Sequence, residues 1–251
     1  MELNTRLYDL FLNQAQQVTL EILSLGLGYT AVTTSDGGIG LSYTYFGDKQ
    51  SCMVLNQHID YEGQSADRLL AKIKSQNPVE RSMALALINA LNYKKALSLP
   101  EDHDNKIMFE KFKIRDGRRV AMVGYFPPFV KRFEHMGVSL EILDISRGLG
   151  QKKDFYHKLE SWAQVLMLTS TSMLNSSTEE ILAHAGKNLK TIMLGPSTPM
   201  AAAAFKNLPV HMLAGTVPVD KENILKAIRH GMGTPVLHKH SRKVFIALPA
   251  K

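Results

Sequence analysis

Three short apolar runs of this chain, at residues 120–123, 165–168 and 191–194, each end in residues that can bind a polar ligand. Glycine lets a ligand come close to the backbone, hydroxyl and amide groups donate and accept hydrogen bonds, and aromatic rings offer stacking surfaces. The candidate binding residues after these runs are Gly124, Tyr125, Phe126, Thr169, Thr171, Asn175, Gly195, Ser197 and Thr198. No acid or base stands beside a nucleophile in the sequence, so catalytic residues stay unassigned.

Four further residues complete the candidate set. Gly215 follows a later apolar run, where it would leave space at the edge of a sheet. Asp144 ends another run and could bind a ribose hydroxyl, although strands often end in Asp for turn reasons. Asn89 lies in an apolar helical pattern, where backbone groups satisfy it or it points into a site between domains. Asp36 lies in a predicted hairpin turn and would reach the site from the first domain.

A helix start could supply an anion site after the third run. Thr198 and Pro199 fit the N-cap and first turn of a helix over 199–207, whose free amides and positive end favour an anion. Capping alone accounts for both residues, so Gly195 and Ser197 are the more informative pair.

Seven hydroxyl residues lie between 169 and 178, more than helix capping explains. Ser177 with Glu180, and Ser176 with Glu179, fit capping boxes that each use one hydroxyl and one acid. The remaining hydroxyls are free to bind a neutral or anionic ligand.

Two familiar kinds of site are disfavoured. A dinucleotide fingerprint needs three glycines after the first run, but only Gly124 is present, and the following Pro-Pro pair removes two N–H donors. Grouped metal ligands are also missing, since Cys52 is the single cysteine and the close pair His238 and His240 is expected at the surface. A metal cofactor would therefore be held by oxygen donors or would arrive as a metal chelate.

The composition excludes several classes of protein. With 30 basic and 23 acidic residues the formal charge is +7, but the basic residues are scattered and no RNA-binding motif is present, so nucleic acid is not an expected partner. No apolar stretch reaches the roughly 18 residues of a membrane span, and no signal-peptide pattern is present, so a cytoplasmic protein is expected. The expected partner is a small-molecule or metal ligand, and a homo-oligomer stays open.

The periodicity of apolar residues predicts two domains, 1–105 and 106–251. The first is an α+β unit with a helix over 5–25, a hairpin of strands 29–34 and 39–46, a strand near 53–55, helices near 65–74 and 78–91, and a linker over 98–106.

Strands and helices alternate in the second domain, which predicts a parallel sheet of the α/β class. Strands are expected near 120–124, 139–143, 165–169, 191–194, 210–213 and 243–248, and helices near 127–136, 154–162, 177–186, 199–207 and 221–231. Ligands of such sheets bind at the carboxyl ends of the strands, so the three runs point to one site.

Several segments, in this order, resemble a bacterial and archaeal family named for heavy-metal chelation. In the second domain they are Val120-Ala-Met-Val-Gly-Tyr-Phe-Pro-Pro-Phe, Thr169-Ser-Thr-Ser-Met-Leu-Asn-Ser-Ser-Thr-Glu-Glu, Leu194-Gly-Pro-Ser-Thr-Pro-Met and Gly215-Thr-Val-Pro-Val-Asp. In the first domain, Gly28-Tyr-Thr-Ala-Val, Gly38-Ile-Gly-Leu-Ser and Ala84-Leu-Ala-Leu-Ile-Asn-Ala-Leu are similar to the family's usual partner domain. After Asn175 the family often has glycine and threonine, where this chain has Ser176 and Ser177.

The resemblance implies an α+β domain like the N-terminal domain of enolase, followed by a Rossmann-like domain, with a site in the cleft between them. It implies a protein that handles a metal or small ligand there. The alternative is an enzyme that uses the same cleft for a nucleotide-like or other anionic ligand. A third hypothesis is a scaffold whose cleft is vestigial.

Overall fold

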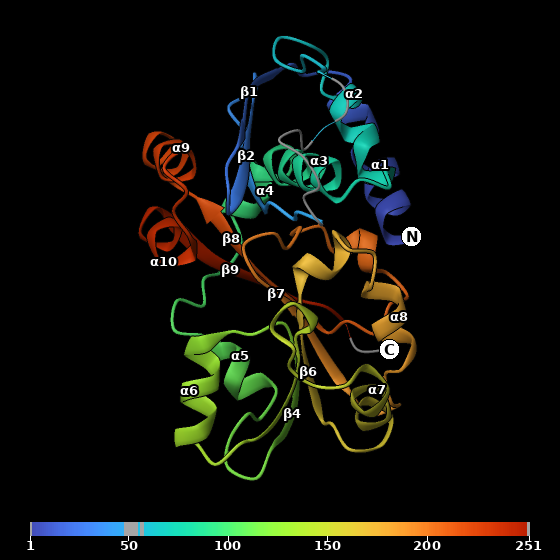
Figure 1. Cartoon of the computed structure of the whole chain (residues 1–251). Helices are drawn as coiled ribbons and strands as arrows, with labels where there is room; N and C mark the ends of the chain where they lie inside the picture. The colour runs from blue at the N-terminus through green and yellow to red at the C-terminus, as the bar shows by residue number, and fades with distance from the viewer. Residues whose placement is uncertain (1, 48–54, 56–57, 250–251) are drawn as a thin grey trace.

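The computed structural model describes residues 2–47, 55 and 58–249, which build two sheets with their helices (Figure 1). The first sheet has three strands in the order β1-β2-β3, and the second has six in the order β5-β4-β6-β7-β8-β9. The second sheet is parallel except for its last strand, β9. The predicted α/β class, preceded by a smaller α+β part, is confirmed.

The N-terminal part begins with a helix and contains an antiparallel meander. Its elements are α1 (Glu2–Ala15), β1 (Leu20–Leu25), β2 (Tyr29–Thr34), β3 (Ile39–Tyr43), α2 (Asp67–Leu70), η1 (Ala71–Lys74), α3 (Pro78–Leu91) and α4 (Tyr93–Leu97). The predicted hairpin joins β2 to β3, and Gly37 supplies the positive φ of +86° that its turn needs. Helix α3 begins at the predicted proline, where the Asn77 side chain accepts a hydrogen bond of 2.9 Å from the Val79 N–H.

Helix α3 lies directly on β3 because Gly40 has no side chain. A Cβ at this position would be 2.2 Å from both the Ala86 carbonyl oxygen and the Ala90 nitrogen. The small residues of α3 and this glycine together let the backbones of helix and strand approach each other.

The helix predicted over 5–25 is wrong in its second half. Helix α1 ends at Ala15, and residues 20–25 form β1, which pairs with β2 from Leu20 opposite Thr34 to Leu25 opposite Thr30. An apolar spacing over so few residues fits either period, and pairing with β2 decides the outcome. The strand predicted near 53–55 cannot be compared, because residues 53 and 54 lie outside the described part.

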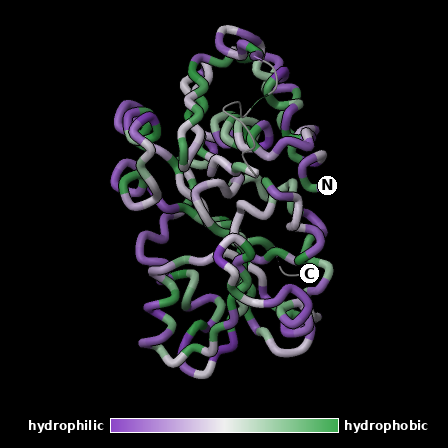
Figure 2. Tube along the Cα trace, viewed as in Figure 1, coloured by the Kyte–Doolittle hydropathy of each residue, from purple (hydrophilic) through white to green (hydrophobic). Residues whose placement is uncertain are grey.

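The C-terminal part alternates strands and helices as predicted. Its elements are α5 (Lys106–Lys111), β4 (Arg119–Val123), α6 (Pro127–His135), β5 (Ser139–Leu143), η2 (Ile145–Arg147), α7 (Lys152–Ser161), β6 (Val165–Thr169), η3 (Ser170–Met173), α8 (Thr178–Ala183), β7 (Lys190–Leu194), η4 (Ala202–Phe205), β8 (Met212–Pro218), α9 (Lys221–Arg229), α10 (Thr234–Leu237), η5 (His238–His240) and β9 (Ser241–Ala247). Figure 2 shows hydrophobic residues along the central strands and hydrophilic residues on the surrounding helices, as expected for a sheet covered on both faces.

The order of the strands creates a switch point between β4 and β6. The chain runs from β4 outward to β5 and then returns to β6 on the other side of β4. Crossovers on the two sides of this point leave in opposite directions, which opens a crevice at the carboxyl ends of β4 and β6. The first and second of the three apolar runs end here.

Two predicted connections differ from the structure. The helix expected over 199–207 is wrong, because only the short η4 (Ala202–Phe205) forms there. The predicted linker 98–106 lies along the edge of β9, where the Phe245 N–H donates to the Pro100 carbonyl and the Asp102 N–H to the Lys243 carbonyl. This pairing covers an edge that would otherwise expose its backbone groups.

The two sheets share hydrophobic contacts. Helix α9 carries buried Ile224 and Ile228 onto the three-stranded sheet, where they pack with Tyr29, Ala31 and Leu41. In Figure 1, α9 lies beside β1 and β2, although it follows β8 in the chain. The N-terminal sheet is therefore held between its own α3 and a helix of the C-terminal part.

Candidate functional site

A cavity of about 1220 Å³ lies over the carboxyl ends of β4, β6 and β7, between the two sheets. We call it the cleft. Tyr29, Tyr43, Tyr45 and Phe46 line it from the N-terminal part. Of the predicted residues, the structure brings ten to its wall: Gly124, Tyr125, Phe126, Asp144, Thr169, Thr171, Asn175, Gly195, Ser197 and Gly215.

The switch point brings Gly124 and Thr169 into contact. Gly124 has φ of +86°, and a Cβ there would lie 3.2 Å from both Cβ and Cγ2 of Thr169. The Thr169 hydroxyl lies 2.9 Å from that of Thr171 and accepts from the Thr171 N–H at 3.3 Å. The backbone of Gly124, which carries no side chain, thus lies next to the hydrogen-bonded hydroxyls of Thr169 and Thr171 at the mouth of the crevice.

Asp144 organises the loop beside Tyr125. Its carboxylate accepts hydrogen bonds from the Tyr125 N–H at 3.0 Å, the Ser146 hydroxyl at 2.6 Å and the Arg147 N–H at 3.2 Å. The Arg147 guanidinium lies 5.2 Å from the centre of the Tyr125 ring. The turn role considered for Asp144 is therefore observed, and the ring of Tyr125 is held under a positive charge. The neighbouring Phe126 ring packs on Phe129 at 6.1 Å.

The hydroxyl-rich segment 169–178 folds back on itself. Asn175 donates to the Tyr45 hydroxyl at 3.4 Å and accepts at 2.7 Å from the Ser177 hydroxyl. Ser177 makes no side-chain cap to α8, so the predicted capping box with Glu180 is wrong. Ser176 has φ of +64°, the backbone conformation that the family's glycine would adopt without strain.

A buried hydroxyl, that of Ser170, lies beside the turn after β7. Gly195 has φ of +123°, and a Cβ there would lie 3.0 Å from the Ser170 Oγ. Ser170 is buried, and its hydroxyl has no hydrogen-bond partner among the described residues. A hydroxyl in this condition has an unused donor and acceptor, so Ser170 joins the candidate set although it was not among the predicted site residues.

Ser197 and Asn89 connect the two sheets. The buried Ser197 hydroxyl accepts from the Tyr43 N–H at 2.7 Å. Asn89 donates to the Leu41 carbonyl at 2.7 Å and to the Ser197 carbonyl at 3.4 Å. The alternative in which backbone groups satisfy Asn89 is therefore observed, and these two residues fix the position of β3 over the sheet edge.

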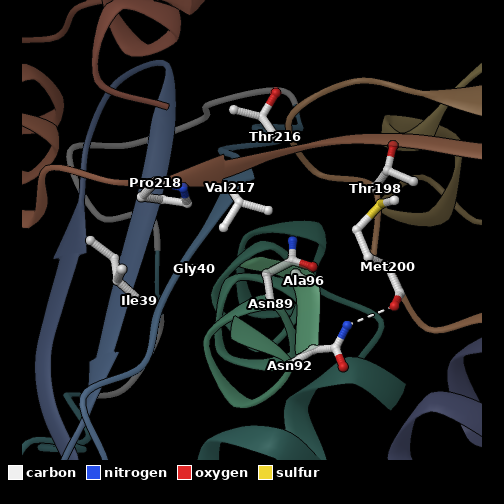
Figure 3. A pocket seen from close by; sticks show the side chains of 10 residues that line it. All are labelled: Ile39, Gly40, Asn89, Asn92, Ala96, Thr198, Met200, Thr216, Val217 and Pro218. Atoms are coloured by element: carbon white, nitrogen blue, oxygen red, sulfur yellow. Dashed lines mark hydrogen bonds between the residues drawn. The ribbon is translucent and has the colours of Figure 1, made fainter. Parts of the chain in front are cut away.

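Thr198 lies behind this contact, at a second cavity of about 10 Å³, the size of one water molecule (Figure 3). The Asn92 side chain donates to the Met200 carbonyl at 2.7 Å. Across the sheet, a Cβ on Gly215 would be 2.6 Å from the Met200 sulfur. Residues 198–200 thus pass over β8 at Gly215, where a helix start was predicted. Because no helix begins at Pro199, Thr198 is not an N-cap, and the anion site predicted at that helix start does not form.

Asp36 lies outside both cavities. Its carboxylate accepts from the Thr34 hydroxyl at 2.7 Å and from the Gly38 N–H at 3.3 Å, and it lies 3.6 Å from the Lys94 ammonium. These contacts hold the β2–β3 turn, and the structure does not bring Asp36 to the other candidates.

Two pairs of titratable side chains in the cleft were not among the predicted site residues, because each pair joins separate elements. Lys152 and Glu180 form an ion pair of 2.6 Å beside Tyr156, and this contact raises the pKa of Lys152 and lowers that of Glu180. His238 and Lys243 lie at the β8–β9 end of the cleft. No spacing in the sequence pairs such residues, since the register of neighbouring elements decides their contacts.

His238 is half-buried rather than at the surface. Burial, and then the charges of Lys243 and His103, lower its pKa to about 4. His238 contacts Thr216 at 3.4 Å, whereas His240 contacts Asp220 at 3.4 Å, so the two histidines do not converge.

Metal ligands do not gather in the part of the chain that the structure describes. No group of three or more His, Cys, Asp or Glu side chains is placed there to hold an ion. Cys52 lies outside the described residues. Across the described ranges, no helix has the length and apolar character that crossing a bilayer requires.

Comparisons with known proteins give a family and a fold. A search of curated proteins finds no match. The structure is similar to those of two DUF364-family proteins of unknown function. One, from Pyrococcus horikoshii, has a TM-score of 0.81 and 20% identity, over 99% of this chain and 100% of that one. The other, from Desulfitobacterium hafniense, has a TM-score of 0.74 and 18% identity, over 96% and 97%.

Two family models match most of the sequence. The DUF4213 model covers residues 8–92 and the DUF364 model residues 107–247, and both are described as "putative heavy-metal chelation". The recognition made from the sequence segments is confirmed. The chain belongs to the DUF364 family, with a DUF4213 region at its N-terminus.

Proposed function

We propose that this protein binds a small organic ligand in the cleft, and that the ligand carries the metal as a chelate. One observation carries the proposal: the cleft is larger than the about 300–1,000 Å³ of common ligand pockets, yet the described residues contain no metal-ligand group. A bare ion needs a few converging ligands, whereas a chelate brings most of its own.

The lining suits an organic ligand. Tyr43 is 39% exposed and faces the cleft beside Tyr29, whose ring centre is 5.8 Å away. Tyr125 lies on the opposite side, below Arg147. Aromatic rings provide apolar contact area, and the hydroxyls of segment 169–178 can fix the orientation of polar groups.

The assignment of the two parts to known types of domain is part of the same proposal. A Rossmann-like domain supplies the switch point, and the residues before about 105 form a domain like the N-terminal domain of enolase that closes the cleft from above. The site then lies between domains 1–105 and 106–251, which is supported by a lining drawn from both.

Equilibrium dialysis followed by elemental analysis tests the proposal with three probes: nickel(II) citrate, nickel(II) alone and citrate alone. We expect about one nickel per chain with the complex and much less with the bare ion. Tyr43→Ala should weaken retention up to about tenfold, since an aromatic contact contributes about 0.5–1.5 kcal/mol. Leu27→Ala is the control, because Leu27 is 80% exposed and outside the cleft lining.

Two outcomes contradict the proposal. The first is no nickel retained in any form. The second is equal retention of bare and chelated nickel that Tyr43→Ala leaves unchanged, which would place the metal elsewhere.

The enzyme alternative is supported by the position of the cleft at the switch point, where nucleotides bind in related sheets. Thermal-shift measurements with nucleotides and S-adenosylmethionine test it, because a bound ligand stabilises the folded state. No shift with any of them removes this alternative, and a saturable shift with one of them favours it over the chelate.

A further inference from the structure

We propose that the β8–β9 corner of the cleft, formed by Thr216, His238 and Lys243, binds a phosphate or carboxylate group. This inference deepens the proposed function by naming the chemistry of one end of the ligand. The inference rests on the proposed function for the part of the ligand that lies outside this corner.

The register of the two strands brings the corner together. Thr216 on β8 is the cross-strand partner of Lys243 on β9, so the two side chains share one face of the sheet. Ala214 and Phe245, the next pair on that face, also line the cleft. The Thr216 hydroxyl lies 3.4 Å from the His238 Nε2, which adds the histidine from η5 to the same face.

Lys243 forms no ion pair with any carboxylate of the described residues. It is half-buried, and its ammonium donates to the His103 carbonyl at 3.1 Å. The other cleft cations have acidic partners: Lys152 has Glu180 at 2.6 Å, and Arg147 has Asp144 at 3.7 Å. Among the described residues Lys243 alone of these three has no ion pair. A partly buried charge is stabilised by a counter-charge, and an anionic ligand would provide it.

Asp102, a lining residue whose backbone N–H donates to the Lys243 carbonyl, has a carboxylate that is already engaged. The two oxygens of Asp102 accept hydrogen bonds from the Ile107 N–H at 3.0 Å and the Met108 N–H at 2.9 Å, at the start of α5. Asp102 therefore stabilises a helix start, while the Lys243 ammonium donates to the His103 carbonyl instead.

His238 complements Lys243 as a neutral hydrogen-bonding group. With a pKa lowered to about 4, its imidazole is uncharged near neutral pH, and the charged or titratable groups that face it are Lys243 on β9 and His103 before α5. When the Thr216 hydroxyl donates to Nε2, the other ring nitrogen carries a proton that it can donate. Lys243 and His238 together then offer an anion one charged and one neutral donor.

Nuclear magnetic resonance of the full chain with ring-labelled histidine tests this subsite, using inorganic phosphate and acetate as probes. We expect a saturable shift of the His238 signal, assigned with His238→Gln, and a rise of its pKa when the anion is bound. The stronger of the two probes identifies a phosphate-bearing or a carboxylate-bearing ligand.

Variants at the lysine give the decisive comparison. Lys243→Met should weaken anion binding about tenfold to a hundredfold, as expected for loss of one charge-assisted hydrogen bond. Lys243→Arg should restore binding, and Lys239→Met, an exposed neighbour outside the cleft, should leave it unchanged. Thermal denaturation confirms that each variant is folded. A His238 signal that neither anion moves, or equal affinity in Lys243→Met, overturns the inference.

The two proposals can fail separately. If phosphate or acetate binds the corner but nickel citrate is not retained, the anion subsite stands and the proposed chelate function fails. If nickel citrate is retained and Lys243→Met leaves its affinity unchanged, the function stands and the subsite fails.

Discussion

Replacing Ser197 with alanine tests how the N-terminal sheet is held over the cleft. The Ser197 hydroxyl is the acceptor for the Tyr43 N–H at 2.7 Å, and Ser197 is 1% exposed, so water cannot easily replace it. A buried donor left without an acceptor costs about 1–3 kcal/mol. We expect the free energy of unfolding to fall by that amount, and the melting temperature to fall by about 2–4 °C for each kcal/mol in a chain of this size.

Urea denaturation followed by circular dichroism measures the effect. Ser161→Ala is the matched control, because the Ser161 hydroxyl donates to the His157 carbonyl on the exposed surface of α7. Surface substitutions of this kind change stability by less than about 0.5 kcal/mol. A loss for Ser197→Ala no larger than for Ser161→Ala would refute the role assigned to this hydrogen bond.

Three further predictions follow from particular residues. Ser176→Gly should raise the free energy of unfolding by about 0.5–1 kcal/mol in urea denaturation, because glycine adopts φ of +64° without strain; a loss of stability would contradict this. Gly40→Ala should destabilise by about 3 kcal/mol or more in the same assay, since its Cβ meets α3 backbone at 2.2 Å, whereas Gly47→Ala, in open space, should have little effect. The pKa of His238 is lowered to about 4, so the unfolded state gains a proton first as the pH falls. Stability should therefore decrease from about pH 6.5 toward pH 4. His238→Gln should flatten this decrease in melting temperatures measured against pH, and an unchanged slope would exclude His238 as its source.

The sheet edge could be predicted from the sequence because its strands leave a strong signal. Runs such as 165–168 are buried on both faces, so they are continuously apolar, and their ends carry glycine and hydroxyl residues. The positions of Gly124, Thr169 and Gly195 in the cleft follow from that pattern. The same reasoning could not separate β1 from α1, because six residues do not distinguish the two periods.

The missed features depend on contacts between distant segments. The helix expected after Pro199 does not form. The Asn92 side chain instead donates a hydrogen bond to the Met200 carbonyl, and because Gly215 has no side chain, Met200 can pack directly on β8. The pairing of Thr216 with Lys243 requires an antiparallel β9, whereas the alternation of elements predicted a parallel sheet. Local patterns carry no information on either contact, since both are set by packing of the complete chain.

Anomalous diffraction at the nickel absorption edge, from crystals grown with nickel citrate, tests the central claim most directly. The proposed function predicts a peak inside the cleft, between the Tyr43 ring and the Gly124 turn, with citrate density around it. A peak on a surface histidine such as His240, or an empty cleft in crystals that contain nickel elsewhere, would contradict it.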